Sequence, residues 1–167
     1  GGTPNAVDSH AAGAARWREL LLLIQMREAD RIADQLRRAL EGDAWHGPSL
    51  AELLMDLSAD HAGARPIADA HSIWGLTRHL TSWTAMARRR LKAGAHIEMP
   101  EEENFPAPSE DWAADRAALF AETRALADDA AQLTEAELNK FRYRLLHGSV
   151  QHHLYHAGQI ALLRKLL

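Results

Sequence analysis

Residues 150–163 read VQHHLYHAGQIALL, and this stretch contains the strongest pattern in the chain. His152 and His156 are four residues apart, so on an α-helix their side chains project from one face, one turn apart. Gln159 follows three residues later on the same face, and leucines continue that face toward a core. The spacing therefore predicts a long helix over 145–167 whose histidine pair points into the protein.

A pair of imidazoles at this spacing can occupy two positions around a metal ion. A third ligand must come from another helix, and His79 is the best candidate because it adjoins the apolar stripe of an earlier predicted helix. Three histidine ligands leave coordination positions open for water or substrate. The alternative is a set of core histidines that are packed or bridged by water, since imidazole is also a tolerated core group.

The pattern differs from that of zinc proteases, because the residue after the first histidine is His153 and the expected glutamate base is missing. Helical geometry points His153 away from His152, so we expect it at the surface or half-buried. It remains an alternative partner of His156. The residues expected beside the metal or in an adjoining pocket are Gln159, His46, His71, Trp83 and His153.

His46 follows the first predicted long helix, and His71 lies at the start of the second. Either could line the mouth of a pocket, but a loop histidine with a local hydrogen bond is the favoured interpretation. The tryptophans are expected in the core rather than on a stacking surface. These are Trp17, Trp74, Trp83 and Trp112.

Apolar residues recur at helical spacing in three further stretches, 14–41, 72–91 and from Ser109 to about residue 133. Short capped turns are predicted at Ser49, Ser58 and Thr134, each set by a capping hydroxyl. Gly94 ends the second long helix, and Gly148 leaves the start of the last one open. Residues 99–109, rich in proline and glutamate, predict a long loop. The fold class is all-α: a four-helix bundle with a long crossover loop and short extra helical turns.

The 167 residues include ten histidines and no cysteine, with a formal charge of −4. Disulfides, thiolate catalysis and cysteine-based zinc sites are therefore excluded. The mildly acidic balance argues against a nucleic-acid partner, and Arg88–Arg90 is expected to be a solvated helix end. The longest apolar run, 20–24, is too short to span a bilayer, so a cytoplasmic protein is expected.

Residues 1–13 have no signal-peptide pattern and are expected to be disordered or left by trimming or engineering of the terminus. Residues 14–167 are expected to form a single domain.

Several motifs together resemble the DinB/YfiT-like superfamily. They are Ala44-Trp45-His46-Gly47-Pro48-Ser49-Leu50, His71-Ser72-Ile73-Trp74, His79-Leu80 with Trp83, and the run from His152 to Leu163. The last run, with its His-x-x-x-His-x-Gly-Gln-Ile pattern, is the most specific. Two positions depart from many relatives: Thr84 follows Trp83 where an acidic residue is common, and His153 stands where Asp is common.

The resemblance implies a divalent metal held by His79, His152 and His156, with zinc or nickel typical and manganese or iron as alternatives. Some relatives transfer low-molecular-weight thiols to electrophiles. The resemblance thus implies a thiol transferase acting on a small-molecule substrate. The alternatives are a metal-dependent hydrolase and a non-enzymatic, stress-related bundle that binds a metal or ligand. A homodimer is also expected, without a nucleic-acid or membrane partner.

Overall fold

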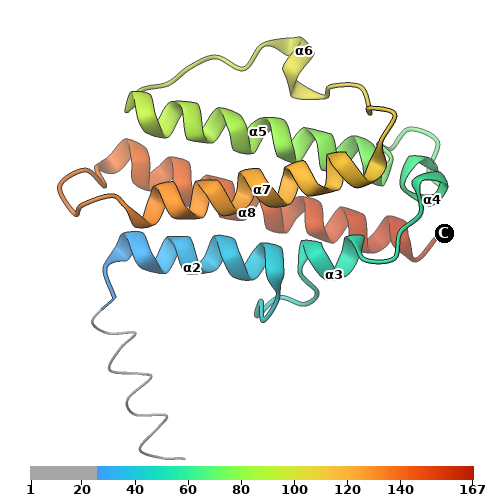
Figure 1. Ribbon diagram of the computed structural model, residues 1–167, viewed down its shortest axis with the longest axis horizontal. Helices are drawn as coiled ribbons and strands as arrows, with labels where there is room; N and C mark the ends of the chain where they lie inside the picture. The colour runs from blue at the N-terminus through green and yellow to red at the C-terminus, as the bar shows by residue number, and fades with distance from the viewer. Residues whose placement is uncertain (1–25) are drawn as a thin grey trace, which may run out of the picture.

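The structure, a computed structural model, describes residues 26–167, and all regular secondary structure in this part of the chain is helical (Figure 1). The predicted all-α class is thereby confirmed for the described residues. Residues 1–13, Trp17 and the first part of the predicted helix 14–41 lie outside them. The helices are α2 (Glu28–Glu41), α3 (Leu50–Leu54), α4 (Ala59–Gly63), α5 (Ile73–Ala93), α6 (Glu101–Asn104), α7 (Trp112–Ala131) and α8 (Lys140–Arg164).

The four longer helices pack around a common core. α7 and α8 each contact both α2 and α5. Figure 1 shows α2 and α8 running in one direction and α5 and α7 in the other. The short helices α3 and α4 cover the end of the molecule where α5 begins, and α3 packs on α2 and α8.

The connection from α5 to α7 runs back along α5 and contains α6 (Figure 1). Its backbone accepts hydrogen bonds from α5 side chains: the Arg90 guanidinium donates to the Ile97 carbonyl and the Ser82 hydroxyl to the Glu103 carbonyl. The predicted loop 99–109 is therefore wrong in one respect, because it includes a helical turn. Loop composition alone does not predict these tertiary hydrogen bonds.

Hydroxyl caps start α3 and α4 as predicted, and a third hydroxyl cap, at Ser72, starts α5. Ser49 forms a complete capping box with Glu52, and Ser58 and Ser72 each accept a backbone N–H three residues on. Gly94 ends α5 in the left-handed conformation, with φ of 64°, which glycine adopts at no steric cost.

The predicted helix 14–41 is interrupted at Arg27, and the predicted starts of the third and fourth long helices are wrong. Arg27 is extended rather than helical, and its guanidinium donates to the carbonyls of Ala131 and Leu133 at the end of α7. Asp111, not Ser109, caps α7, because Ser109 bonds Asp115 instead. α8 begins at Lys140, capped by Asn139, and continues through Gly148 without a break.

The core consists of two apolar clusters separated by a polar layer. Leu80, Leu119 and Ile160 belong to one cluster, and Leu126 and Leu146 belong to the other. Between them, in sequence order along α5, α7 and α8, lie the buried side chains of Thr84, Thr123 and His153. No helix among residues 26–167 combines the length and the apolar character that crossing a bilayer requires.

A buried carboxylate ties α7 to α5. Asp115 is 5% exposed and accepts hydrogen bonds from the Trp74 indole (2.6 Å), the Arg78 guanidinium (2.8 Å) and the Ser109 hydroxyl (2.8 Å). Burial alone would raise the pKa of Asp115, but the hydrogen bonds from these three partners outweigh it and hold the pKa below its ordinary value of 3.8.

We predict that Asp115→Asn lowers the free energy of unfolding by about 2 kcal/mol at pH 7, because buried donors lose a charged acceptor. The native pKa lies below the unfolded one, so the carboxylate's contribution is present above pH 3.8 and is lost as pH falls through the native value. Urea unfolding should therefore show that the difference in unfolding free energy between parent and variant becomes smaller as the pH falls below 3.8. Asp128→Asn, an exposed α7 carboxylate paired with Arg37, is the control and should cost less than about 1 kcal/mol. Equal stability of parent and Asp115→Asn at pH 7 would contradict this account.

Candidate metal centre

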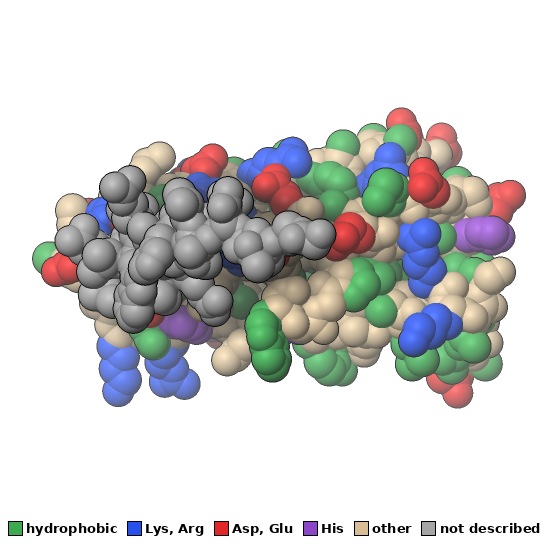
Figure 2. Space-filling model, turned by 90° about the horizontal axis from the view of Figure 1, so that it is seen from below, with side chains coloured by type: hydrophobic (Ala, Val, Ile, Leu, Met, Phe, Trp, Pro, Cys, Tyr) green, Lys and Arg blue, Asp and Glu red, His purple; other side chains and the backbone are tan. Residues whose placement is uncertain are grey.

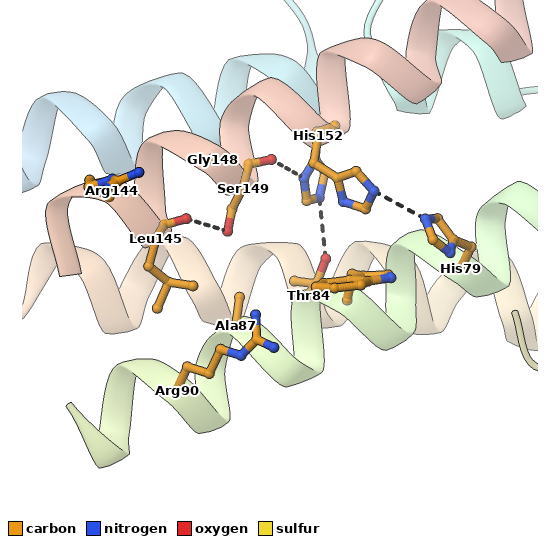
Figure 3. A pocket seen from close by; sticks show the side chains of 11 residues that line it. His79, Thr84, Ala87, Arg90, Arg144, Leu145, Gly148, Ser149 and His152 are labelled. Atoms are coloured by element: carbon orange, nitrogen blue, oxygen red, sulfur yellow. Dashed lines mark hydrogen bonds between the residues drawn. The ribbon is translucent and has the colours of Figure 1, made fainter. Parts of the chain in front are cut away.

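Three histidines from two helices meet at one point. His79 comes from α5, and His152 and His156 come from α8. The Nε2 atom of His152 lies 3.1 Å from Nε2 of His79 and 2.9 Å from Nε2 of His156. His79 and His156 are each 6% exposed, and the three potential ligand atoms lie within 4.8 Å of one another. Figure 3 shows His79 and His152 facing each other from opposite helices.

In two of the three rings, Nδ1 points away from the cluster and is hydrogen-bonded. Nδ1 of His79 donates to the backbone carbonyl of Asn104 (2.6 Å), and Nδ1 of His156 donates to the side-chain carbonyl of Gln159 (2.6 Å). The orientation of the Gln159 amide follows from its NH₂ group, which donates to the Tyr155 hydroxyl (3.2 Å). Because a neutral imidazole has one N–H, Nε2 of His79 and Nε2 of His156 are both bare lone pairs.

The centre consequently has too few protons for its nitrogens. His152 can place at most one proton between itself and its two neighbours, so at least one inward lone pair is left without a donor. Adding a proton is disfavoured. Burial, followed by the charges of His156, His79 and His153, lowers the pKa of His152 to about 3. Burial also lowers the pKa of His79 and of His156, and the hydrogen bonds that these rings donate to Asn104 and Gln159 act in the opposite direction.

A divalent cation held by these residues would satisfy all three lone pairs at once. Neutral imidazole is the form of histidine that binds metals, and two ligands about 2.1 Å from one zinc ion are roughly 3.4 Å apart at a tetrahedral angle. The observed separations of 3.1 and 2.9 Å need only a small opening to reach that spacing. The outer hydrogen bonds to Asn104 and Gln159 are those that fix the tautomer and orientation of ligating histidines.

Aromatic rings cover the cluster. Phe105 stacks on His79 on one side and on His71 on the other, with ring centroids 3.9 Å apart in both pairs. The Trp83 indole lies edge-on to His152 and donates to the side chain of Asn104 (2.8 Å). His71 and Trp83 thus lie beside the cluster.

Two of these residues, Asn104 and Phe105, were missed by the sequence analysis. The only signal was an isolated aromatic residue between prolines in a polar segment.

His153 contradicts the sequence-based expectation of a surface or half-buried residue, since it is 1% exposed. Its Nδ1 donates to the Ser149 carbonyl (2.8 Å), and its Nε2 accepts from the Thr123 hydroxyl (3.1 Å). Pairing with threonines across the core makes burial of the imidazole acceptable. His46 is exposed in the turn between α2 and α3, and none of the described contacts joins it to the three-histidine cluster.

A cavity of about 450 Å³ opens beside the histidines, between α5 and α8 (Figure 3). His79 and His152 line one end, Arg90 and Arg144 line the other, and Trp83 is among the residues between them. The cavity thus reaches two of the three clustered histidines, His79 and His152.

The fold and the site together define a class: an all-helical protein with a buried three-histidine cluster that could hold a metal ion. The family follows from comparison. The family model described as the DinB superfamily matches residues 43–160, more than half of the chain, and the protein belongs to this superfamily. The comparisons with curated proteins and with solved structures gave no match.

We predict that the untagged protein binds about one equivalent of a divalent metal through this three-donor site. The His79, His152, His156→Ala triple variant should bind none, because all inward lone pairs are removed. Metal content is measured by mass spectrometry after dialysis, and circular dichroism verifies that the variant is folded. The matched control replaces three exposed histidines, His46, His61 and His96, and should retain the metal. A parent that stays empty after incubation with zinc and nickel would exclude the metal site.

Gln159→Leu should weaken metal binding about 10- to 100-fold, because the Nδ1 proton of His156 loses its acceptor and the ring loses its fixed tautomer. Competition with a chromophoric chelator measures the change. Gln151→Leu, on an exposed position of the same helix, is the control and should bind metal like the parent. Equal affinity of the Gln159→Leu variant and the parent would show that the hydrogen bond does not orient His156.

Proposed function

We propose that this protein is a metal-dependent four-helix-bundle enzyme that transfers a low-molecular-weight thiol to an electrophilic small molecule. The ligands are His79, His152 and His156, and an all-imidazole donor set suits zinc or nickel, with manganese or iron as weaker candidates. The observation that best supports the proposal is the convergence of three Nε2 atoms with a proton deficit beside an open cavity.

A thiol supplied from outside suits this chain, because it has no cysteine. A bound metal supplies Lewis acidity, which keeps a coordinated thiol ionised at neutral pH. In the transfer, the sulfur–carbon bond forms, the bond from that carbon to its leaving group breaks, and the thiol proton passes to solvent.

The chain's own residues position the reactants. Asn104 and Gln159 hold the rings of His79 and His156 in the tautomer whose bare Nε2 faces His152. Trp83 and Phe105 cover the cluster and limit the access of water from their side. The cavity admits the substrate from the side of α5 and α8.

Hydrolysis by a metal-activated water is the main alternative. A general base, most often histidine or a carboxylate, usually assists such a reaction. The described residues that line the cavity include no aspartate or glutamate, and both ring nitrogens of His153 are bonded within the core. The lining therefore favours thiol transfer over hydrolysis. Non-enzymatic binding of a metal or ligand remains an outcome of the test below.

We predict metal-dependent conjugation when the metal-loaded protein is incubated with low-molecular-weight thiols and 1-chloro-2,4-dinitrobenzene. The sulfur displaces chloride, and absorbance of the aryl thioether follows the rate. Turnover should vanish in the His79, His152, His156→Ala variant together with the metal, and persist in the His46, His61, His96→Ala control.

A second assay with 4-nitrophenyl acetate and no thiol separates the alternatives. Metal-dependent ester cleavage without conjugation would replace the transferase with a hydrolase. Full metal occupancy with no turnover in either assay would leave a binding protein and overturn the enzymatic proposal.

A further inference from the structure

The cavity beside the histidine cluster is elongated along α8. His152 lines one end, and Arg144 lines the other about two helical turns earlier, which corresponds to roughly 12 Å along the helix axis. Trp83, Ala87 and Leu145 supply apolar walls between these ends. A ligand that fills the cavity would therefore extend well beyond a metal ion bound at the histidines.

Gly148 forms part of the wall of this cavity. It lies in the interior of α8, where glycine costs about 1 kcal/mol relative to alanine. Its φ is not positive, and an added Cβ would meet no atom within 4 Å. Backbone geometry and tight helix packing therefore do not require a glycine here. What its missing side chain does provide is open space in the cavity, midway between His152 and Arg144.

The far end of the cavity is cationic. The Arg90 guanidinium is half-buried over the Trp83 ring, 5.4 Å from its centroid, and donates to the carbonyl of Ile97. Arg144 has no hydrogen bond or ion pair with any residue in the described part of the chain. Among the other described arginines, Arg88 and Arg89 of the same helix as Arg90 are both bound by carboxylates.

Glu98 interacts electrostatically with Arg90, but its carboxylate is hydrogen-bonded to His96. No aspartate or glutamate lines the cavity among the described residues. The predicted solvated helix end at Arg88–Arg90 is consequently wrong for Arg90, because the α5–α7 connection folds back over it. Lys140 adds further positive charge, since it lines the adjoining surface hollow together with Arg90 and Arg144.

We propose that this cavity binds an elongated organic acid, with its carboxylate between Arg90 and Arg144, its apolar body along Trp83 and Gly148, and its other end at the histidine cluster. Guanidinium groups are suited to carboxylates through paired N–H donors. Trp83 and Leu145 bury the apolar body. The inference rests on the proposed function, because the acid group would be part of either the electrophile or the thiol. Its binding can nevertheless be measured without turnover.

The test is calorimetric titration of the metal-loaded protein with 6-phenylhexanoate and with 6-phenylhexan-1-ol, which has the same body without the charge. The acid should bind at least about 10-fold more tightly than the alcohol, as expected for a charge-assisted pair. Arg144→Gln should reduce this preference to near unity. Lys165→Gln, at the opposite end of α8, makes the same charge change and should leave it intact.

The glycine variants test the position of the ligand. Gly148→Leu places a side chain in the cavity and should abolish binding of both probes, while the protein stays folded and metal-loaded, because the helix gains a better helix former. Gly158→Leu is the matched control. Gly158 is an exposed glycine in the interior of the same helix with no atom within 4 Å of an added Cβ, and it does not line the cavity, so its variant should bind like the parent.

Equal affinity for acid and alcohol, no binding of either, or unchanged binding by Gly148→Leu would each overturn the inference. Its failure is distinguishable from failure of the proposed function. Acid binding with the expected variant pattern but no conjugation would retain the acid site and remove the transferase. Conjugation of a neutral electrophile without acid binding would do the reverse.

Discussion

The structure depends on one constraint, the hydrogen-bond requirement of imidazole nitrogens held inside a helical core. Two Nδ1 protons are committed outward, to Asn104 and Gln159, so bare Nε2 atoms face one another around His152. An unsatisfied buried lone pair is costly. Burial and the neighbouring histidines lower the pKa of His152 to about 3, so added protons do not relieve this cost at neutral pH. A bound cation would satisfy these lone pairs, and the three histidines could hold one.

The segment between α5 and α7 orients and covers these histidines. Its short helix α6 ends at Asn104, whose backbone carbonyl fixes His79 and whose side chain fixes Trp83. Phe105 then covers the cluster by stacking on His79. A connection that returns along α5 costs conformational entropy. Here that cost is offset by hydrogen bonds and ring contacts at the one place where the histidines need orientation and cover.

The polar layer across the core anchors the residue next to His152. His153 bonds Thr123 and the backbone of Ser149, so the residue next to His152 is anchored in the middle of the core. Because adjacent helical residues project about 100° apart, anchoring His153 inward on one side sets the direction of His152 on the other. The cavity beside them joins an uncharged, metal-ready end to a cationic end, and this asymmetry is what selects an orientation for an elongated acid.

The sequence by itself determined the helical class, the capped starts at Ser49 and Ser58, and the pairing of His152 with His156 on one helix face, because helical period and capping are local rules. It also singled out His79 as the third histidine, from its place beside the apolar stripe of another predicted helix. It mispredicted His153 and the solvation of Arg90, and it missed Asn104 and Phe105. The burial of His153 depends on Thr123, thirty residues away in the chain. The roles of Arg90, Asn104 and Phe105 depend on the path of the α5–α7 connection. Only tertiary structure decided these, since the physical reason for each is a partner that no local pattern specifies.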